Sequence, residues 1–62
     1  MNIRIEKFRK EKGLTQGALA MQLGVKQGAV AMWETGKALP RADKLPKLAE
    51  ILDCTVDELL KR

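Results

Sequence analysis

Few side chains in this 62-residue sequence could carry out catalysis. It contains no histidine and a single cysteine, so a zinc site lacks its usual ligands and an internal disulfide cannot form. Four carboxylates lie near one another toward the C-terminal end, at predicted helix caps and exposed helix faces: Glu50, Asp53, Asp57 and Glu58. No nucleophile is paired with a base, and no glycine-rich loop could hold a phosphate. We therefore expect no enzyme activity, no metal and no cofactor.

The basic side chains are better suited to bind a partner. The formal net charge is +4, and residues 1–40 account for this whole excess, whereas residues 41–62 balance their acidic and basic groups. The cations of the first part are Arg4, Lys7, Arg9, Lys10, Lys12, Lys26 and Lys37. Such a group can neutralise nucleic-acid phosphates, although a modest positive charge can also serve only to keep a small protein in solution.

The segment Leu14–Trp33 is the part of the chain that could position such groups. Thr15 is a predicted N-cap of a first helix. Gly24 stands where this helix must end and the backbone must reverse, with a positive φ. A second helix is predicted over Gln27–Glu34, with apolar side chains one turn apart on one side. Two helices joined by a short glycine-containing turn form a helix-turn-helix, in which the second helix enters the major groove of DNA.

Three further helices complete an all-α prediction. One spans about Ile3–Lys12, and another spans about Asp43–Leu52, with Pro46 in its first turn. A last short helix begins at Thr55, which forms a capping box with Glu58. We expect one domain over residues 1–62, a compact five-helix bundle, with Cys54 packed as a small hydrophobe at its last turn. The predicted core is Ile5, Phe8, Leu14, Leu19, Leu23, Val25, Val30, Leu45, Leu48, Leu52, Val56 and Leu59.

With these elements in this order, the sequence resembles the phage-repressor/Cro-type helix-turn-helix family, also called Xre-like. The resemblance extends from about residue 5 to residue 60. It rests on GLTQ at residues 13–16, LA at 19–20, LGV at 23–25, AV at 29–30, WE at 33–34, GK at 36–37, Pro40, LPKLAEIL at 45–52 and TVDELL at 55–60. The resemblance implies a lambda-repressor-like bundle that binds double-stranded DNA.

The resemblance also implies roles for individual residues. The groove-facing positions, which read bases, are Lys26, Gln27, Gly28, Ala31 and Met32. The phosphate contacts are Gln16 at the start of the preceding helix and Lys37 beside Gly36, with Arg9, Lys10 and Arg41 as further candidates. Glutamine can pair with adenine or donate to a phosphate, and lysine can donate to guanine or to a phosphate. Arg9 and Glu34 are either an ion pair between two helices or two solvated charges.

Several residues depart from the pattern of the family. Lys26 replaces the Ser or Thr that commonly caps the second helix, and Gly28 stands where a polar base-reading side chain is common. Only Lys26 and Gln27 remain as polar readers, so sequence specificity is expected to be modest or to depend on DNA shape. Met21 lies on an uncharged helix that either faces core and DNA or forms a patch for a protein partner. Trp33 is expected to pack inward rather than to stack on a base.

The sequence favours a sequence-specific transcription regulator, repressor-like, that binds a palindromic operator. The alternative is an antitoxin or adaptor, a protein-interaction module that uses the same fold. No signal-peptide pattern follows Met1 and no run of about 18 apolar residues occurs, so we expect a cytoplasmic protein without a membrane segment. No coiled coil or second domain is visible. We therefore expect a weak or DNA-induced homodimer.

Overall fold

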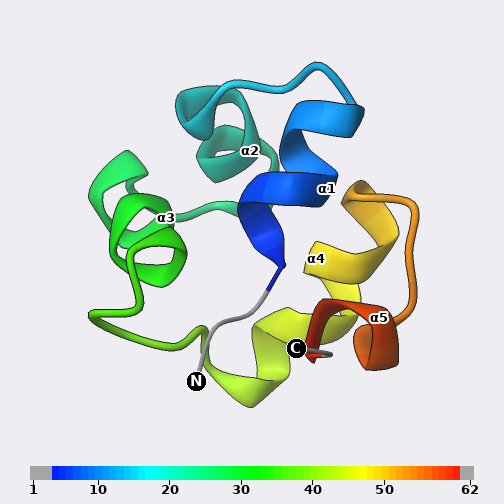
Figure 1. Ribbon diagram of the computed structural model, residues 1–62. Coiled ribbons are helices and arrows are strands. Elements are labelled where there is room, and N and C mark those ends of the chain that lie inside the picture. The colour runs from blue at the N-terminus through cyan, green and yellow to red at the C-terminus, as the bar shows by residue number, and fades with distance from the viewer. Residues whose placement is uncertain (1–3, 61–62) are drawn as a thin grey trace.

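The computed structural model describes residues 4–60, which fold into five α-helices and one short 3-10 helix (Figure 1). In chain order these are α1 (Ile5–Glu11), α2 (Gln16–Leu23), α3 (Gln27–Glu34), the 3-10 helix η1 (Ala42–Lys44), α4 (Leu45–Ile51) and α5 (Val56–Leu60). α2 packs against both α3 and α4, α1 contacts α3, and α4 contacts α5. The predicted all-α five-helix bundle is confirmed, and residues 4–60 contain no strand. None of the helices in this part of the chain is long and apolar enough to cross a membrane.

Two helix starts are set by threonine side chains, as predicted. Thr15 Oγ1 accepts a hydrogen bond from the Ala18 N–H at 3.0 Å, which satisfies a free donor in the first turn of α2. The Glu58 N–H donates to Thr55 Oγ1 at 3.0 Å, and the Thr55 N–H donates to Glu58 Oε1 at 2.9 Å. This reciprocal pair is a capping box, which fixes the start of α5. The helix predicted over residues 3–12 corresponds to α1, and residue 3 lies outside the described residues.

The chain reverses after α2 through a residue in the left-handed conformation. Gly24 has φ +78°, and the N–H groups of Gly24 and Val25 donate to the carbonyls of Met21 and Ala20 at 3.3 and 3.0 Å. This is a Schellman motif, and it confirms the positive φ predicted at Gly24. α4 ends in the same way, but with Asp53 at φ +57°. A short polar side chain tolerates this conformation better than most, and no sequence signal marked the position.

The predicted fourth helix, over residues 43–52, is two elements. η1 comes first and is closed by the Lys44 N–H, which donates to the Arg41 carbonyl at 2.9 Å. α4 follows, with Pro46 in its first turn. Because proline has no N–H, the i to i−4 ladder of an α-helix cannot run through residue 46, and the regular helix therefore begins at Leu45, with Pro46 in its first turn.

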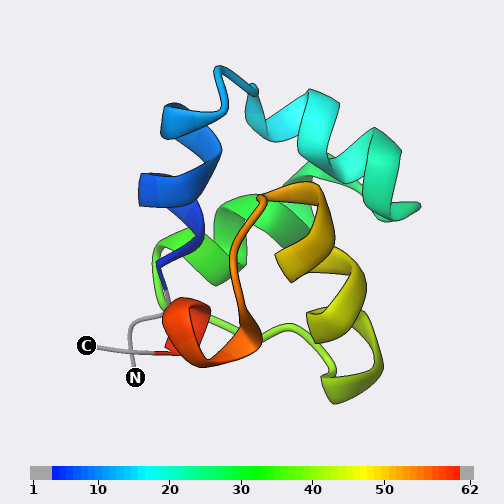
Figure 2. The ribbon, with the colours of Figure 1, turned by 90° about the vertical axis from the view of Figure 1, so that its right-hand side faces the viewer.

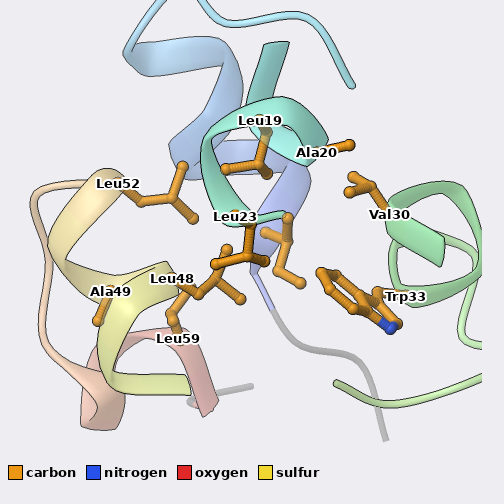
Figure 3. Packing of buried hydrophobic residues seen from close by; sticks show 10 residues of the cluster. Leu19, Ala20, Leu23, Val30, Trp33, Leu48, Ala49, Leu52 and Leu59 are labelled. Carbon is orange, nitrogen blue, oxygen red and sulfur yellow. The ribbon is translucent and has the colours of Figure 1, made fainter. Parts of the chain in front are cut away.

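One buried cluster joins all five α-helices (Figure 3). It contains Ile5, Leu19, Ala20, Leu23, Val30, Trp33, Leu48, Ala49, Leu52 and Leu59. The remaining predicted core residues lie at the edge of this cluster and are partly buried: Phe8, Leu14, Val25, Leu45 and Val56. Cys54 is also partly buried against the cluster. The Arg4 N–H donates to the Leu59 carbonyl at 2.9 Å, which holds α5 beside the start of α1 (Figure 2). The core thus fixes α2 and α3 in one orientation.

Candidate nucleic-acid interface

The apolar side of α3 holds this helix against α2. Val30 is fully buried and Trp33 is 7% exposed. In Figure 3 both side chains point from α3 toward the buried side chains of α2, which include Leu19 and Leu23. The inward packing predicted for Trp33 is therefore confirmed. Because one side of α3 belongs to the core, its opposite side is left to solvent.

The exposed side of α3 carries the residues that the resemblance assigned to the groove. Lys26, Gln27 and Gly28 are exposed at its N-terminal end, Met32 is 45% exposed, and Ala31 is half-buried. Gly28 and Met32 are four residues apart, as are Gln27 and Ala31, so these pairs share a side of the helix. The structure therefore brings Gln27, Gly28, Ala31 and Met32 together on one side, with Lys26 at its start. This surface offers two polar groups and apolar atoms that fit thymine methyls.

The start of α3 lacks a side-chain cap, as predicted. Within residues 4–60, the Lys26 side chain makes no capping hydrogen bond, although the Lys26 carbonyl accepts from the Ala29 N–H at 3.0 Å. The first N–H groups of a helix carry partial positive charge. At α3 they follow the exposed residue Lys26, so this end of the helix carries positive charge.

A buried hydrogen-bond network, built around one ion pair, joins α1, α2 and α3. Arg9 Nε donates to Glu34 Oε2 at 2.6 Å and Arg9 Nη2 donates to Glu34 Oε1 at 3.1 Å, a bidentate arrangement. Arg9 Nη1 donates to the Leu14 carbonyl at 2.8 Å, and Gln16 Nε2 donates to Glu34 Oε1 at 3.0 Å. The side chains of Arg9 and Glu34 are 11% and 2% exposed. Of the two alternatives for these residues, the ion pair is confirmed.

The pair keeps its charges at neutral pH. Burial raises the pKa of Glu34, but hydrogen bonds from Arg9 and Gln16, together with the nearby positive charges, outweigh burial and lower the pKa below its ordinary value. The hydrogen bond to Glu34 raises the pKa of Arg9. Among residues 4–60, no buried side-chain nitrogen or oxygen lacks a hydrogen-bond partner. The network is therefore complete, and a loss of either charge would leave the other unpaired.

This network competes with the phosphate role expected of Arg9. Its Nε, Nη1 and Nη2 atoms are directed to Glu34 and Leu14, and its side chain is almost closed to solvent. A phosphate could reach it only if the ion pair opened. Gln16 is different, because it is half-buried and one of its two amide N–H groups is used by Glu34. Its second N–H stays a candidate phosphate donor whose orientation is set by Glu34.

The other predicted phosphate contacts are exposed cations. Lys37 and Arg41 lie on the connection between α3 and η1, and the Lys37 N–H donates to the Met32 carbonyl at 2.9 Å. This hydrogen bond fixes the backbone beside the end of α3. Lys10 Nζ lies 3.6 Å from the Glu6 carboxylate, an exposed pair of the kind that contributes little to stability. All three cations are thus exposed, and Lys10 has Glu6 as a neighbouring anion.

One contact at the start of α3 involves a residue with no role in the sequence predictions. The Gln27 side-chain amide lies beside Gly17 in the first turn of α2, where a methyl group on Gly17 would be 3.5 Å from Gln27 Oε1. At Gly28, by contrast, an added methyl group would meet nothing within 4 Å among the described residues. The only sequence signal for Gly17 is a glycine inside a helical segment, where alanine is more favourable.

Comparisons with known proteins agree with this geometry. Residues 5–59 match the model of a protein family described as helix-turn-helix. The chain is 39% identical over 59 residues to the HTH-type transcriptional activator BcrR of Enterococcus faecalis, which covers 95% of this chain and 29% of that protein. It is 36% identical over 61 residues to repressor protein C2 of Salmonella phage P22, covering 98% of this chain and 28% of the repressor. The chain thus spans less than a third of these two relatives.

Other similarities cover most of this chain and most of the matched chain. The uncharacterized HTH-type transcriptional regulator YazB of Bacillus subtilis is 39% identical over 90% of this chain and 81% of its own length. A crystal structure of the P22 c2 repressor with a synthetic operator superposes with TM-score 0.88 and 36% identity, covering 94% of this chain and 88% of that chain. The biofilm regulator SinR in complex with DNA gives TM-score 0.84 and 34% identity, covering 94% of both chains. This chain belongs to the helix-turn-helix family.

Proposed function

We propose that this chain is a sequence-specific, duplex-DNA-binding transcription regulator that places α3 in the major groove. The observation that carries this proposal is the division of α3 into two sides. Val30 and Trp33 fix one side in the core, while Gln27 and Met32 are exposed on the other. A helix presented in this way, next to exposed cations, is suited to base contacts flanked by phosphate contacts. The SinR and P22 c2 structures, both complexes with DNA, support the same target.

Within this proposal the exposed residues fall into two groups. Lys26 and Gln27 are the polar readers of base edges, and the apolar surface of Gly28, Ala31 and Met32 contacts thymine methyls or the sugar. The phosphate contacts are Gln16, Lys10, Lys37 and Arg41. With two polar readers, the chain discriminates few base pairs directly, and DNA shape supplies part of the specificity.

The proposal assigns binding rather than catalysis to this chain. No cluster of three or more His, Cys, Asp or Glu side chains that could hold a metal ion occurs within residues 4–60. The relatives are named as transcription regulators, activators and repressors, and none of these names supports the antitoxin or adaptor alternative. We propose a repressor-like role because one relative is the repressor protein C2 of phage P22. We propose a cytoplasmic location because the proposed target is DNA.

Binding to duplex DNA is expected to weaken steeply with salt. About three to four cationic side chains near phosphates, each contributing about −0.9, give a slope of log affinity against log salt of about −2.7 to −3.6 for each bound monomer. Between 50 and 200 mM salt the affinity should fall about 40- to 150-fold. Fluorescence anisotropy of a labelled duplex over this range measures the slope. Lys37→Ala should reduce the slope by about 1 on every duplex, and a salt-independent affinity would contradict the proposal.

We also propose that the chain is a monomer that pairs only on DNA. Among residues 4–60, the large exposed apolar side chains are Met21, Met32 and Leu39, on three different segments. They offer little surface compared with the roughly 1,000 Å² that a stable interface buries. Two half-sites about 34 Å apart on a palindromic operator would raise the effective concentration of each monomer for the other.

Analytical ultracentrifugation separates these possibilities. At micromolar concentration without DNA the chain should sediment as a monomer. With a duplex of two half-sites, the two-to-one complex should form cooperatively, whereas a duplex with one half-site should bind a single monomer. A stable dimer at low micromolar concentration without DNA would show that this proposal is wrong.

A further inference from the structure

The first turn of α2 and the first residue of α3 meet at a single small position. A methyl group on Gly17 would lie 3.5 Å from Gln27 Oε1, 3.9 Å from Gln27 Cδ and 4.0 Å from Thr15 Oγ1. The amide end of Gln27 therefore lies next to the place that a side chain at residue 17 would occupy. Gln27 is nevertheless an exposed residue. The proposed reading residue thus lies beside α2 in the free protein.

The backbone does not require glycine at this position. Gly17 lies inside α2 and is not among the residues with positive φ, unlike Gly24 at the end of the same helix. A glycine inside a helix is less favourable than alanine. What glycine provides here is room for the Gln27 amide. One methyl group on residue 17 would already be in ordinary van der Waals contact with this amide, so a larger side chain would have to displace it.

We infer that Gly17 is a positioning residue for base recognition, because a side chain larger than alanine at this position would displace the Gln27 amide. This inference rests on the proposed function, in which Gln27 reads a base. A long side chain that must be ordered on binding loses rotamer freedom. Glycine at residue 17 leaves the Gln27 amide at one point beside the first turn of α2. A larger side chain at residue 17 would push the amide away from that point.

The inference predicts a graded effect of side-chain size at residue 17. Gly17→Ala adds one methyl group at a permitted distance, so discrimination at the base pair read by Gln27 should stay within about twofold of the wild type. Gly17→Val adds two further carbons next to the Gln27 amide. It should reduce that discrimination about three- to tenfold, since it removes part of one bidentate base contact. Affinity for duplexes of unrelated sequence should change little.

Competition binding with duplexes that differ at single base pairs provides this measurement. Gln22→Val is the matched control, because Gln22 is an exposed residue of α2 that lies more than one turn away from residue 17. It should leave the discrimination unchanged. Circular dichroism melting shows that each variant is folded before its binding is measured.

A double-mutant cycle separates positioning of Gln27 from a direct effect on DNA. In a Gln27→Ala background, Gly17→Val should cause no further loss of discrimination. A loss that persists without the Gln27 amide, or an equal fall in affinity for all duplexes, would overturn the role of Gly17. If Gln27→Ala itself left discrimination unchanged, the reading role of Gln27 would fail first, and the inference would fail with it.

A measurement on the free protein tests the contact even if Gly17→Val does not fold. In Gly17→Ala, the added methyl group should show a nuclear Overhauser effect to the side-chain amide protons of Gln27. The methyl groups of Ala18 and Ala29 serve as internal references for the intensity of such effects. The absence of any effect between residue 17 and the Gln27 side chain would overturn the inference.

Discussion

Glu34→Ala is expected to destabilise the fold by about 3–5 kcal/mol, because it leaves Arg9 as a buried cation without its anion. The Glu34 carboxylate accepts hydrogen bonds from Arg9 Nε and Nη2 and from Gln16 Nε2, and its side chain is 2% exposed. A domain of this length has a total stability of about 3–9 kcal/mol. The variant should therefore lose about half or more of the stability of the wild type, as measured by urea denaturation followed by circular dichroism.

Two controls identify the buried charge as the cause. Glu6 also lies near Arg9, at 4.0 Å from Nη2, but its side chain is 57% exposed. Glu6→Ala should change stability by less than about 0.5 kcal/mol. The double variant Arg9→Met and Glu34→Leu removes both charges and should recover much of the loss. Equal effects of Glu34→Ala and Glu6→Ala would contradict the role assigned to the ion pair.

The ion pair of Arg9 and Glu34 also predicts that the fold loses stability in acid. The pKa of Glu34 in the folded protein lies below its ordinary value of about 4.3. A lowered folded pKa gives stability that is fully present above the unfolded value and is lost as pH falls through the folded value. The free energy of unfolding should therefore decrease as the pH falls below about 5 and continues through the lowered pKa of Glu34. The double variant without both charges should lose less stability over this interval.

Trp33→Ala is expected to reduce stability by about 3–5 kcal/mol and to release α3 from α2. Trp33 is 7% exposed and packs with Val30 against the buried side of α2 (Figure 3). Removal of a large aromatic side chain leaves a cavity that a small core cannot close. Because Trp33 is the only tryptophan, unfolding of the variant is followed by circular dichroism rather than by fluorescence.

Met32 provides the matched control for Trp33. It is the preceding residue on the same helix and is 45% exposed. Met32→Ala should change stability by less than about 0.5 kcal/mol, although it removes apolar surface from the proposed reading side. If the two variants were equally stable, Trp33 would not anchor α3 in the way the structure indicates.

The fold was largely predictable because local signals mark its boundaries. Thr15, Gly24 and the pair Thr55 and Glu58 set helix ends through hydrogen bonds within a few residues, and all of them act as predicted. The left-handed turn at Asp53 was not predicted, because aspartate tolerates this conformation but, unlike glycine, does not by itself mark the end of a helix. The 3-10 turn before α4 depends on how the i to i−4 ladder begins around a proline, which composition alone does not fix.

The site was predictable only in part, since its contacts connect residues far apart in the sequence. The apolar spacing of α3 correctly predicted which side is buried. The burial of Arg9, which competes with its expected phosphate role, depends on Glu34, twenty-five residues away in sequence. The contact of Gln27 with Gly17 depends on the angle at which α2 meets α3, and this angle is a property of the whole core.

Base discrimination by Gln27 is the most direct test of α3 as a DNA-reading helix. A preferred duplex is first selected from a random pool, and affinities are then measured for this duplex and all its single base-pair variants. Gln27→Ala should lose about 1–3 kcal/mol of discrimination at one base pair and keep its affinity for unrelated duplexes. Lys37→Ala should instead weaken binding to all duplexes alike. No preferred duplex for the wild type, or a uniform loss for Gln27→Ala, would contradict this function of α3.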